Sequence, residues 1–265
     1  MRTEVRIIAG TLTVALLIAT ATLLIPVPET WDGTAAGFHV PLAMNSIIAC
    51  LHTGAAVLFL SSLAAYKATL RRAYVAISMA IVVAALGTLQ LPILNGFDLW
   101  DLAWVKDGGV GLPFLLSGLA LYIGTRNLGR LVGVKSLLTK AGIVLPAVIV
   151  LSAATVFLPH VASATSEQAF DASNAILAWS ALFEGTAALI MLRVLKRIGA
   201  HYVTAMAWLS ATLLTAFIIL TIAIVHTLFT SATQDAVNTT IDVLAILTGF
   251  MWLRAGYAFA ATEDY

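Results

Sequence analysis

The chain has 265 residues, of which 61% are hydrophobic and only 10% are charged. A soluble domain carries about 45 to 50% apolar and about 25% charged residues, so this composition excludes a water-soluble fold and predicts a protein of the lipid bilayer. The single cysteine excludes a disulfide framework and any multi-cysteine metal site, and a formal net charge of +1 gives no electrostatic basis for binding nucleic acid.

Eight apolar stretches are long enough, or nearly so, to cross a bilayer as a helix, which needs about 20 residues. In chain order they cover residues 7–25, 40–65, 73–94, 110–124, 141–158, 173–192, 203–229 and 238–258. These are continuous apolar runs without the ten-residue alternation of barrel strands. The fourth is short and begins at a glycine-rich run before Pro113, so we expect its outer end to be irregular. The sequence therefore predicts an all-α polytopic membrane protein with eight transmembrane helices.

The orientation of these spans is predicted by the distribution of basic residues, since short loops rich in Lys and Arg stay in the cytoplasm. Thirteen of the 14 basic residues fall at one set of span ends, and only Lys106 falls in a loop of the other set. The loops of that other set instead hold acidic residues such as Asp98, Asp101 and Glu167. Both termini are therefore expected in the cytoplasm, with the chain in the plasma (inner) membrane.

The two halves of the chain resemble each other in sequence. Short matches occur in order at offsets between 128 and 133 residues. The matched positions are Pro26 with Pro159, His52 with Glu184, Tyr74 with Tyr202, and Gly118 with Gly249. This pattern predicts two tandem four-helix repeats, residues 1–130 and 131–265, related by an axis along the membrane normal. Unrelated helices of similar composition are the alternative.

Two ionisable side chains fall near the predicted bilayer midplane. His52 lies about twelve residues into the second span, or roughly 18 Å, and Glu184 lies at a similar depth in the sixth. Such groups are costly in lipid and need a protein or water environment. One interpretation is a pair that binds a ligand or cation or relays a proton. The other is a structural pair that holds two helix bundles together.

A second set of ligand-type residues is predicted near the outer surface. It comprises His39, His160 and His226, with Asp171, Asp235 and Asp242 at nearby heights. Imidazole and carboxylate groups are the usual ligands of zinc, and imidazole also suits copper. No close ligand spacing accompanies them, so a metal site formed by His39, His160, His226 and Asp242 is a hypothesis that rests on residue type alone.

Haem is a further possibility, because membrane cytochromes hold it between histidines at matching depth. His52 lies near the midplane, whereas His226 lies close to the outer end of its span. The four-plus-four plan is similar to that of the eight-helix haem A synthases in architecture alone. Their paired histidines are absent here, where Glu184 takes the place of a second His52, so we assign the chain to no family.

Three classes of function remain. The first is a non-enzymatic membrane module, a sensor or hydrophobic subunit of a complex, that binds a small ligand or a partner within the bilayer. The second is a small secondary transporter or proton-coupled carrier with its site between the repeats. The third is a haem-binding electron carrier. No phosphate-binding loop or nucleophile motif favours an enzyme, no cofactor is expected, and the expected partners are lipid, other membrane proteins or further copies of the chain.

Overall fold

The computed structural model describes residues 3–24, 40–65, 68–97, 99, 101–102, 105, 109–134, 172–199, 202–226 and 231–261. Within these ranges the chain forms α-helices and short 3₁₀ segments and no strand, as the sequence predicts. The α-helices are α1 (Thr3–Leu24), α2 (Val40–Ser61), α3 (Ala68–Gly96), α5 (Leu112–Leu131), α7 (Ala172–Val194), α8 (Val203–His226) and α9 (Ser231–Ala260).

Six helices, α2, α3, α5, α7, α8 and α9, are long and apolar enough to cross a membrane. Their outward faces carry large exposed apolar side chains, including Val57, Leu86 and Phe250. Such a surface is favourable in contact with lipid and unfavourable in contact with water. The chain is therefore a helical, multi-pass membrane protein. Helix α1 coincides with the first predicted span, whereas the predicted span 141–158 lies outside the described residues.

Several helices extend beyond the apolar runs that predicted them. Helix α5 continues past residue 124 through Arg126 and Arg130, and α3 begins before residue 73 with Arg71 and Arg72. The backbone hydrogen bonds of a helix do not stop where the apolar residues stop, so the charged turns continue it beyond the hydrocarbon region. A hydropathy pattern therefore predicts the buried length of each helix better than its ends.

The outer end of the fourth predicted span is irregular, as the sequence indicates. A 3₁₀ segment, Gly109–Gly111, precedes α5, and Pro113 lies in the first turn of that helix, where its missing N–H costs nothing. The side-chain amide of Gln90 donates a hydrogen bond of 2.8 Å to the carbonyl oxygen of Val110, which ties this segment to α3.

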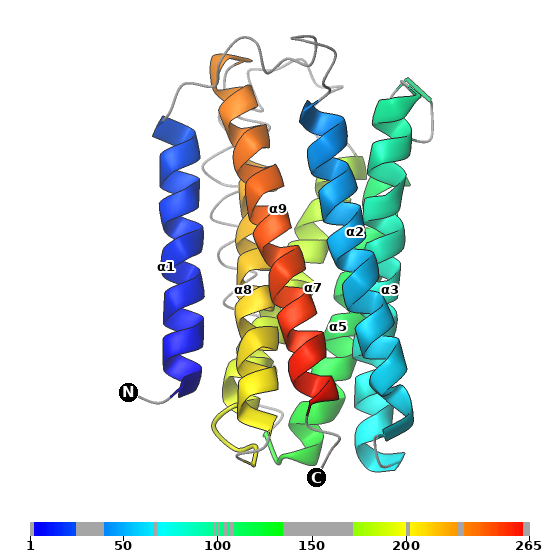
Figure 1. Cartoon of the computed structure of the whole chain (residues 1–265), viewed down its shortest axis with the longest axis vertical. Coiled ribbons are helices and arrows are strands. Elements are labelled where there is room, and N and C mark those ends of the chain that lie inside the picture. The colour runs from blue at the N-terminus through cyan, green and yellow to red at the C-terminus, as the bar shows by residue number, and fades with distance from the viewer. Residues whose placement is uncertain are drawn as a thin grey trace.

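The six spanning helices form a closed ring. In order around it, α2 packs on α3, α3 on α5, α5 on α7, α7 on α8, α8 on α9, and α9 on α2. Helix α1 lies outside the ring against α8 and α9, at the edge of the bundle (Figure 1). A ring of six helices encloses a central space, and the side chains that point into it decide what the protein can hold.

Small residues let neighbouring helices approach closely. A Cβ built on Gly124 of α5 would lie 2.7 Å from Cγ1 of Ile77 on α3, and one on Gly249 of α9 would lie 2.8 Å from Cβ of Leu51 on α2. Ala55, Ala187 and Ala188 are fully buried at similar contacts. In lipid, helices associate through such close packing because the hydrophobic effect does not favour one apolar surface over another.

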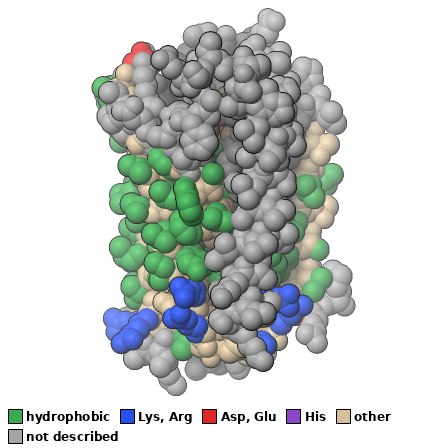
Figure 2. Space-filling model, turned by 180° about the vertical axis from the view of Figure 1, so that it is seen from behind, with side chains coloured by type: hydrophobic (Ala, Val, Ile, Leu, Met, Phe, Trp, Pro, Cys, Tyr) green, Lys and Arg blue, Asp and Glu red, His purple; other side chains and the backbone are tan. Residues whose placement is uncertain are grey.

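The two ends of the bundle differ in charge. Helix α1 begins, and α9 finishes, at the same end (Figure 1). Figure 2 shows Lys and Arg side chains gathered at that end, below a wide band of hydrophobic side chains. The basic residues of the described ranges lie at this end of their helices: Arg6, Arg71, Arg72, Arg126, Arg130, Arg193, Lys196, Arg197 and Arg254.

Candidate functional site

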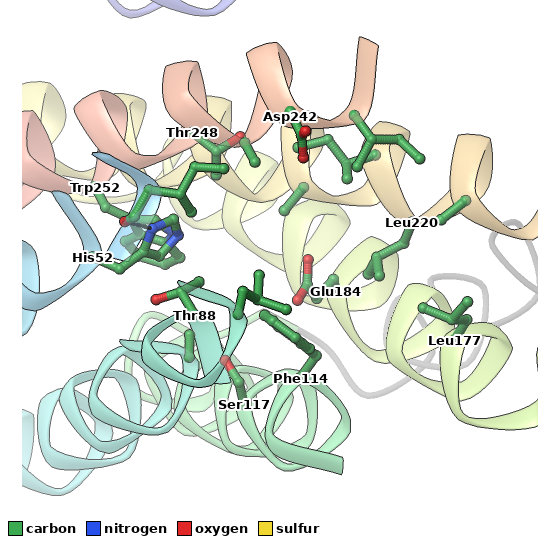
Figure 3. Close-up of a pocket in the computed structure, with 18 of the residues that line it drawn as sticks. His52, Thr88, Phe114, Ser117, Leu177, Glu184, Leu220, Asp242, Thr248 and Trp252 are labelled. Carbon is green, nitrogen blue, oxygen red and sulfur yellow. Dashed lines mark hydrogen bonds between the residues drawn. The ribbon is translucent and has the colours of Figure 1, made fainter. Parts of the chain in front are cut away.

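A cavity of about 260 Å³ lies inside the ring, and residues from all six spanning helices line it (Figure 3). Most of its wall is apolar, with the aromatic side chains of Phe114 and Trp252 among the larger contributors. Three ionisable side chains are also part of this wall: His52 from α2, Glu184 from α7 and Asp242 from α9. A concave, mainly apolar site with a few convergent polar groups is typical of a small-molecule site.

His52 is positioned by its own helix and lies next to a glycine of α9. Its ring nitrogen Nδ1 lies 2.9 Å from the carbonyl oxygen of Ile48, one turn earlier, and the residue is 7% exposed. A carbonyl oxygen only accepts hydrogen bonds, so Nδ1 carries the proton, and the Nε2 of a neutral ring is left as an acceptor. Gly249 of α9 lies next to the ring, and a Cβ built on it would be in van der Waals contact with Nδ1, at 3.4 Å.

Glu184 is buried without a hydrogen-bond partner for one of its oxygens. The residue is 7% exposed, and no atom of the described residues donates to its Oε2. Its helix packs against α5 at Gly118, where a Cβ would lie 3.6 Å from the Cγ of Glu184. Buried polar groups are almost always hydrogen-bonded, so an orphaned carboxyl oxygen at a cavity wall needs an explanation.

His52 and Glu184, which the sequence singles out together, both line this cavity. Each lies twelve residues after its helix begins, at Val40 and at Ala172. Figure 3 shows them on different sides of the cavity, and among the described residues no hydrogen bond joins them.

Asp242, predicted only as one of the possible outer metal ligands, also lines this cavity. The sequence places its span from residue 238, whereas α9 begins at Ser231, so Asp242 lies eleven residues into the helix. In Figure 3 its carboxyl group lies toward the Glu184 side of the cavity. The helical spacing of Asp242, Ala245, Thr248 and Trp252, which all line the cavity, is the sequence signal that would have revealed this face.

The other members of the predicted metal set are not placed. His39 and His160 lie outside the described residues, and for His226 only the backbone at the end of α8 is described. Within the described residues, no group of three or more His, Cys, Asp or Glu side chains is arranged to hold a metal ion.

Polar groups without charge complete the wall, and the sequence did not single them out. Thr88 Oγ1 donates to the carbonyl oxygen of Ala85 at 2.9 Å, and Thr248 Oγ1 donates to that of Leu244 at 2.8 Å. Asn45 and Ser117 also line the cavity. Hydroxyl groups that bond to their own helix are common in membrane helices and carry no distinctive sequence pattern.

The ionisable groups of this wall can bind a ligand or exchange protons. The described lining residues include one imidazole and two carboxyl groups but no Cys, Lys or Arg. No known protein family, curated protein or solved structure matches the chain. The case for a function thus rests on the cavity and its ionisable groups.

Proposed function

We propose that the chain is a non-enzymatic membrane module, a sensor or the hydrophobic subunit of a membrane complex, that binds a small ligand in the cavity within the bilayer. The observation that carries this proposal is the buried Oε2 of Glu184, which has no hydrogen-bond partner among the described residues and lies in the wall of a cavity of about 260 Å³. Because ionisable groups at membrane depth are costly, they are usually kept for function. A ligand that satisfied Glu184 would account for its position.

The proposal includes eight spans in two tandem repeats, with the site between them. Exchanging α2 with α7, α3 with α8 and α5 with α9 maps every contact of the ring onto another contact of the ring. The exchange also relates His52 against Gly249 to Glu184 against Gly118. Both relations are expected of halves that a twofold axis along the membrane normal relates.

The proposed location is the plasma (inner) membrane with both termini in the cytoplasm. The support is the basic end of the bundle, where α1 begins and α9 finishes (Figure 2). As a subunit, the chain would associate with other membrane proteins or with further copies of itself.

A transporter or proton-coupled carrier is the second candidate. One observation favours it: the cavity lies between α2, α3 and α5 of the first half and α7, α8 and α9 of the second. Secondary transporters with internal repeats place their substrate sites at such an interface and open them by rocking one half against the other. A haem-binding carrier stays a prediction, since the side chains of His39, His160 and His226 are not described.

The test is to fill the cavity and ask whether a small molecule is lost. Ala84 and Ala245 line it from α3 and α9, and their joint replacement by Leu adds six carbon atoms to its wall. We expect small molecules released from the purified wild type, identified by mass spectrometry, to be missing from Ala84→Leu/Ala245→Leu.

The matched control is Ala9→Leu/Ala21→Leu, which adds the same atoms to exposed positions of α1. This variant should carry the same small molecules as the wild type. A wild type that releases none, or a filled variant that releases the same ones, would contradict the proposal. Solute flux into vesicles that contain the protein alone would favour the transporter over the sensor or subunit.

A further inference from the structure

The polar groups of the cavity wall offer a ligand mainly hydrogen-bond acceptors. Thr88 and Thr248 give their only hydroxyl protons to carbonyl oxygens of their own helices. His52 directs its Nδ1 proton to Ile48, which leaves Nε2 as an acceptor. The donors that remain on the described wall belong to Asn45, Ser117 and Trp252, and none of these side chains is charged.

Carboxyl groups are the groups of this wall that can pair with a cation. Glu184 and Asp242 supply two carboxyl groups, and no Lys or Arg is among the described lining residues. The buried Oε2 of Glu184 has no donor within the described structure. A ligand that brings its own positive charge and its own N–H donors would complement both groups, and such charge-assisted hydrogen bonds are the stronger ones.

The rest of the wall suits an apolar body attached to that cation. Phe114 and Trp252 present aromatic rings to the cavity, and rings of this kind attract ammonium groups as well as apolar surfaces. A cavity of about 150 Å³ holds one benzene molecule. At about 260 Å³, this cavity has room for one ring with a short chain.

We propose that the cavity binds a small lipophilic amine, of one ring or similar size, whose ammonium group pairs with Glu184 on the side shared with Asp242 and whose apolar part lies toward Trp252. This inference rests on the proposed ligand-binding function and names the chemical class of the ligand. In this binding mode the ammonium group lies at the Glu184 side of the cavity. The apolar part lies at the His52 side, where Figure 3 shows Trp252.

The test uses the full chain in nanodiscs of phosphatidylcholine, a lipid without net charge, and radiolabelled 2-phenylethylamine as the probe. Empty nanodiscs correct for partition of the probe into lipid. We expect saturable binding that unlabelled 2-phenylethanol, of the same size but neutral, displaces at least about tenfold less effectively than the unlabelled amine. Phenylacetate, with the opposite charge, should not displace the probe.

Variants then assign the binding to the carboxyl groups. Glu184→Gln keeps the shape and removes the charge, so we expect it to weaken binding by at least about tenfold, the lower range for a hydrogen bond to a charged partner. Asp242→Asn should have a smaller effect, because that residue is only partly buried. Glu184→Asp should retain binding, and Glu4→Gln in α1, far from the cavity, is the matched control.

Each result separates the two proposals. Absence of saturable amine binding, equal displacement by the alcohol, or an unchanged affinity in Glu184→Gln would overturn the amine proposal. If the alcohol or phenylacetate binds instead, and Ala84→Leu/Ala245→Leu abolishes that binding, the ligand-binding function stands and only the ligand class is wrong. Elution profile and circular dichroism of each variant exclude loss of binding through misfolding.

Discussion

Replacing Glu184 with methionine should make the ligand-free protein more stable. The side chain is 7% exposed, and its Oε2 has no hydrogen-bond partner within the described residues. If Glu184 is kept for a ligand, its presence costs stability whenever the cavity holds none. Methionine has a similar length and volume, fills irregular spaces and contains no group that needs a hydrogen bond.

The size of the effect follows from two opposing contributions. A buried polar group without a hydrogen bond costs about 1 to 3 kcal/mol on the scale of protein mutations. A replacement of conserved volume costs less than about 1.5 kcal/mol in repacking. The Cγ of Glu184 lies next to Gly118, which has no side chain to oppose the new atoms. We therefore expect a net gain of about 1 to 2 kcal/mol in the free energy of unfolding.

The assay is unfolding by sodium dodecyl sulfate in mixed micelles, followed by tryptophan fluorescence, on protein freed of small molecules. Glu184→Gln leaves a polar group in the same place and should change the stability little, and Glu4→Gln should not change it. If Glu184 instead forms a structural ion pair, Glu184→Met would destabilise the fold by about 3 to 5 kcal/mol. The two interpretations thus differ in the sign of the effect, and a loss of that size would refute ours.

Two further outcomes test the packing and the orientation. Gly124→Ala should destabilise the fold by about 1 to 3 kcal/mol, because the new Cβ would lie 2.7 Å from a side-chain carbon of α3. Gly10→Ala, with nothing within 4 Å, should leave the stability unchanged or raise it by up to about 1 kcal/mol; equal effects in the same unfolding assay would contradict the close approach of α3 and α5. In a Cys50→Ser background, a membrane-impermeant maleimide should label Asp101→Cys in intact cells and Arg72→Cys only after lysis. The reverse pattern would overturn the proposed orientation.

The sequence predicts the class of fold well but not the arrangement of its helices. Long apolar runs identify the spanning helices because the bilayer core requires about 20 apolar residues and a closed set of backbone hydrogen bonds. The order of helices in the ring is not predictable in this way. In lipid, the faces of α3 that touch α2 and α5 are no more apolar than the face that touches the membrane, so hydropathy does not distinguish them. Glycine contacts such as Gly124 against Ile77 make the distinction, and they appear only in three dimensions.

Part of the candidate site is predictable from the sequence, because ionisable side chains are energetically costly at membrane depth and therefore rare there. His52 and Glu184 stand out in an apolar sequence because an ionisable group at that depth needs an explanation. Asp242 was predicted only as one of the outer metal-ligand candidates, although its helical spacing to Thr248 and Trp252 marks it as part of this face of α9. The sequence does not identify Thr88 and Thr248 as cavity residues. Their hydroxyl groups bond to their own helix, as threonine hydroxyls do anywhere in a membrane helix.

Where the two proposed repeats differ in their cavity-lining residues, the difference is informative about the site. In the proposed arrangement, helix exchange relates His52 to Glu184, and each lies next to a glycine on the helix that packs against it, Gly249 and Gly118. The packing is alike at the two positions, but one presents a neutral acceptor and the other a carboxyl group. Asp242 adds a second carboxyl group on the Glu184 side. A symmetric scaffold that needed only to hold its helices together has no use for this difference, whereas a site that orients a ligand with one charged end requires it.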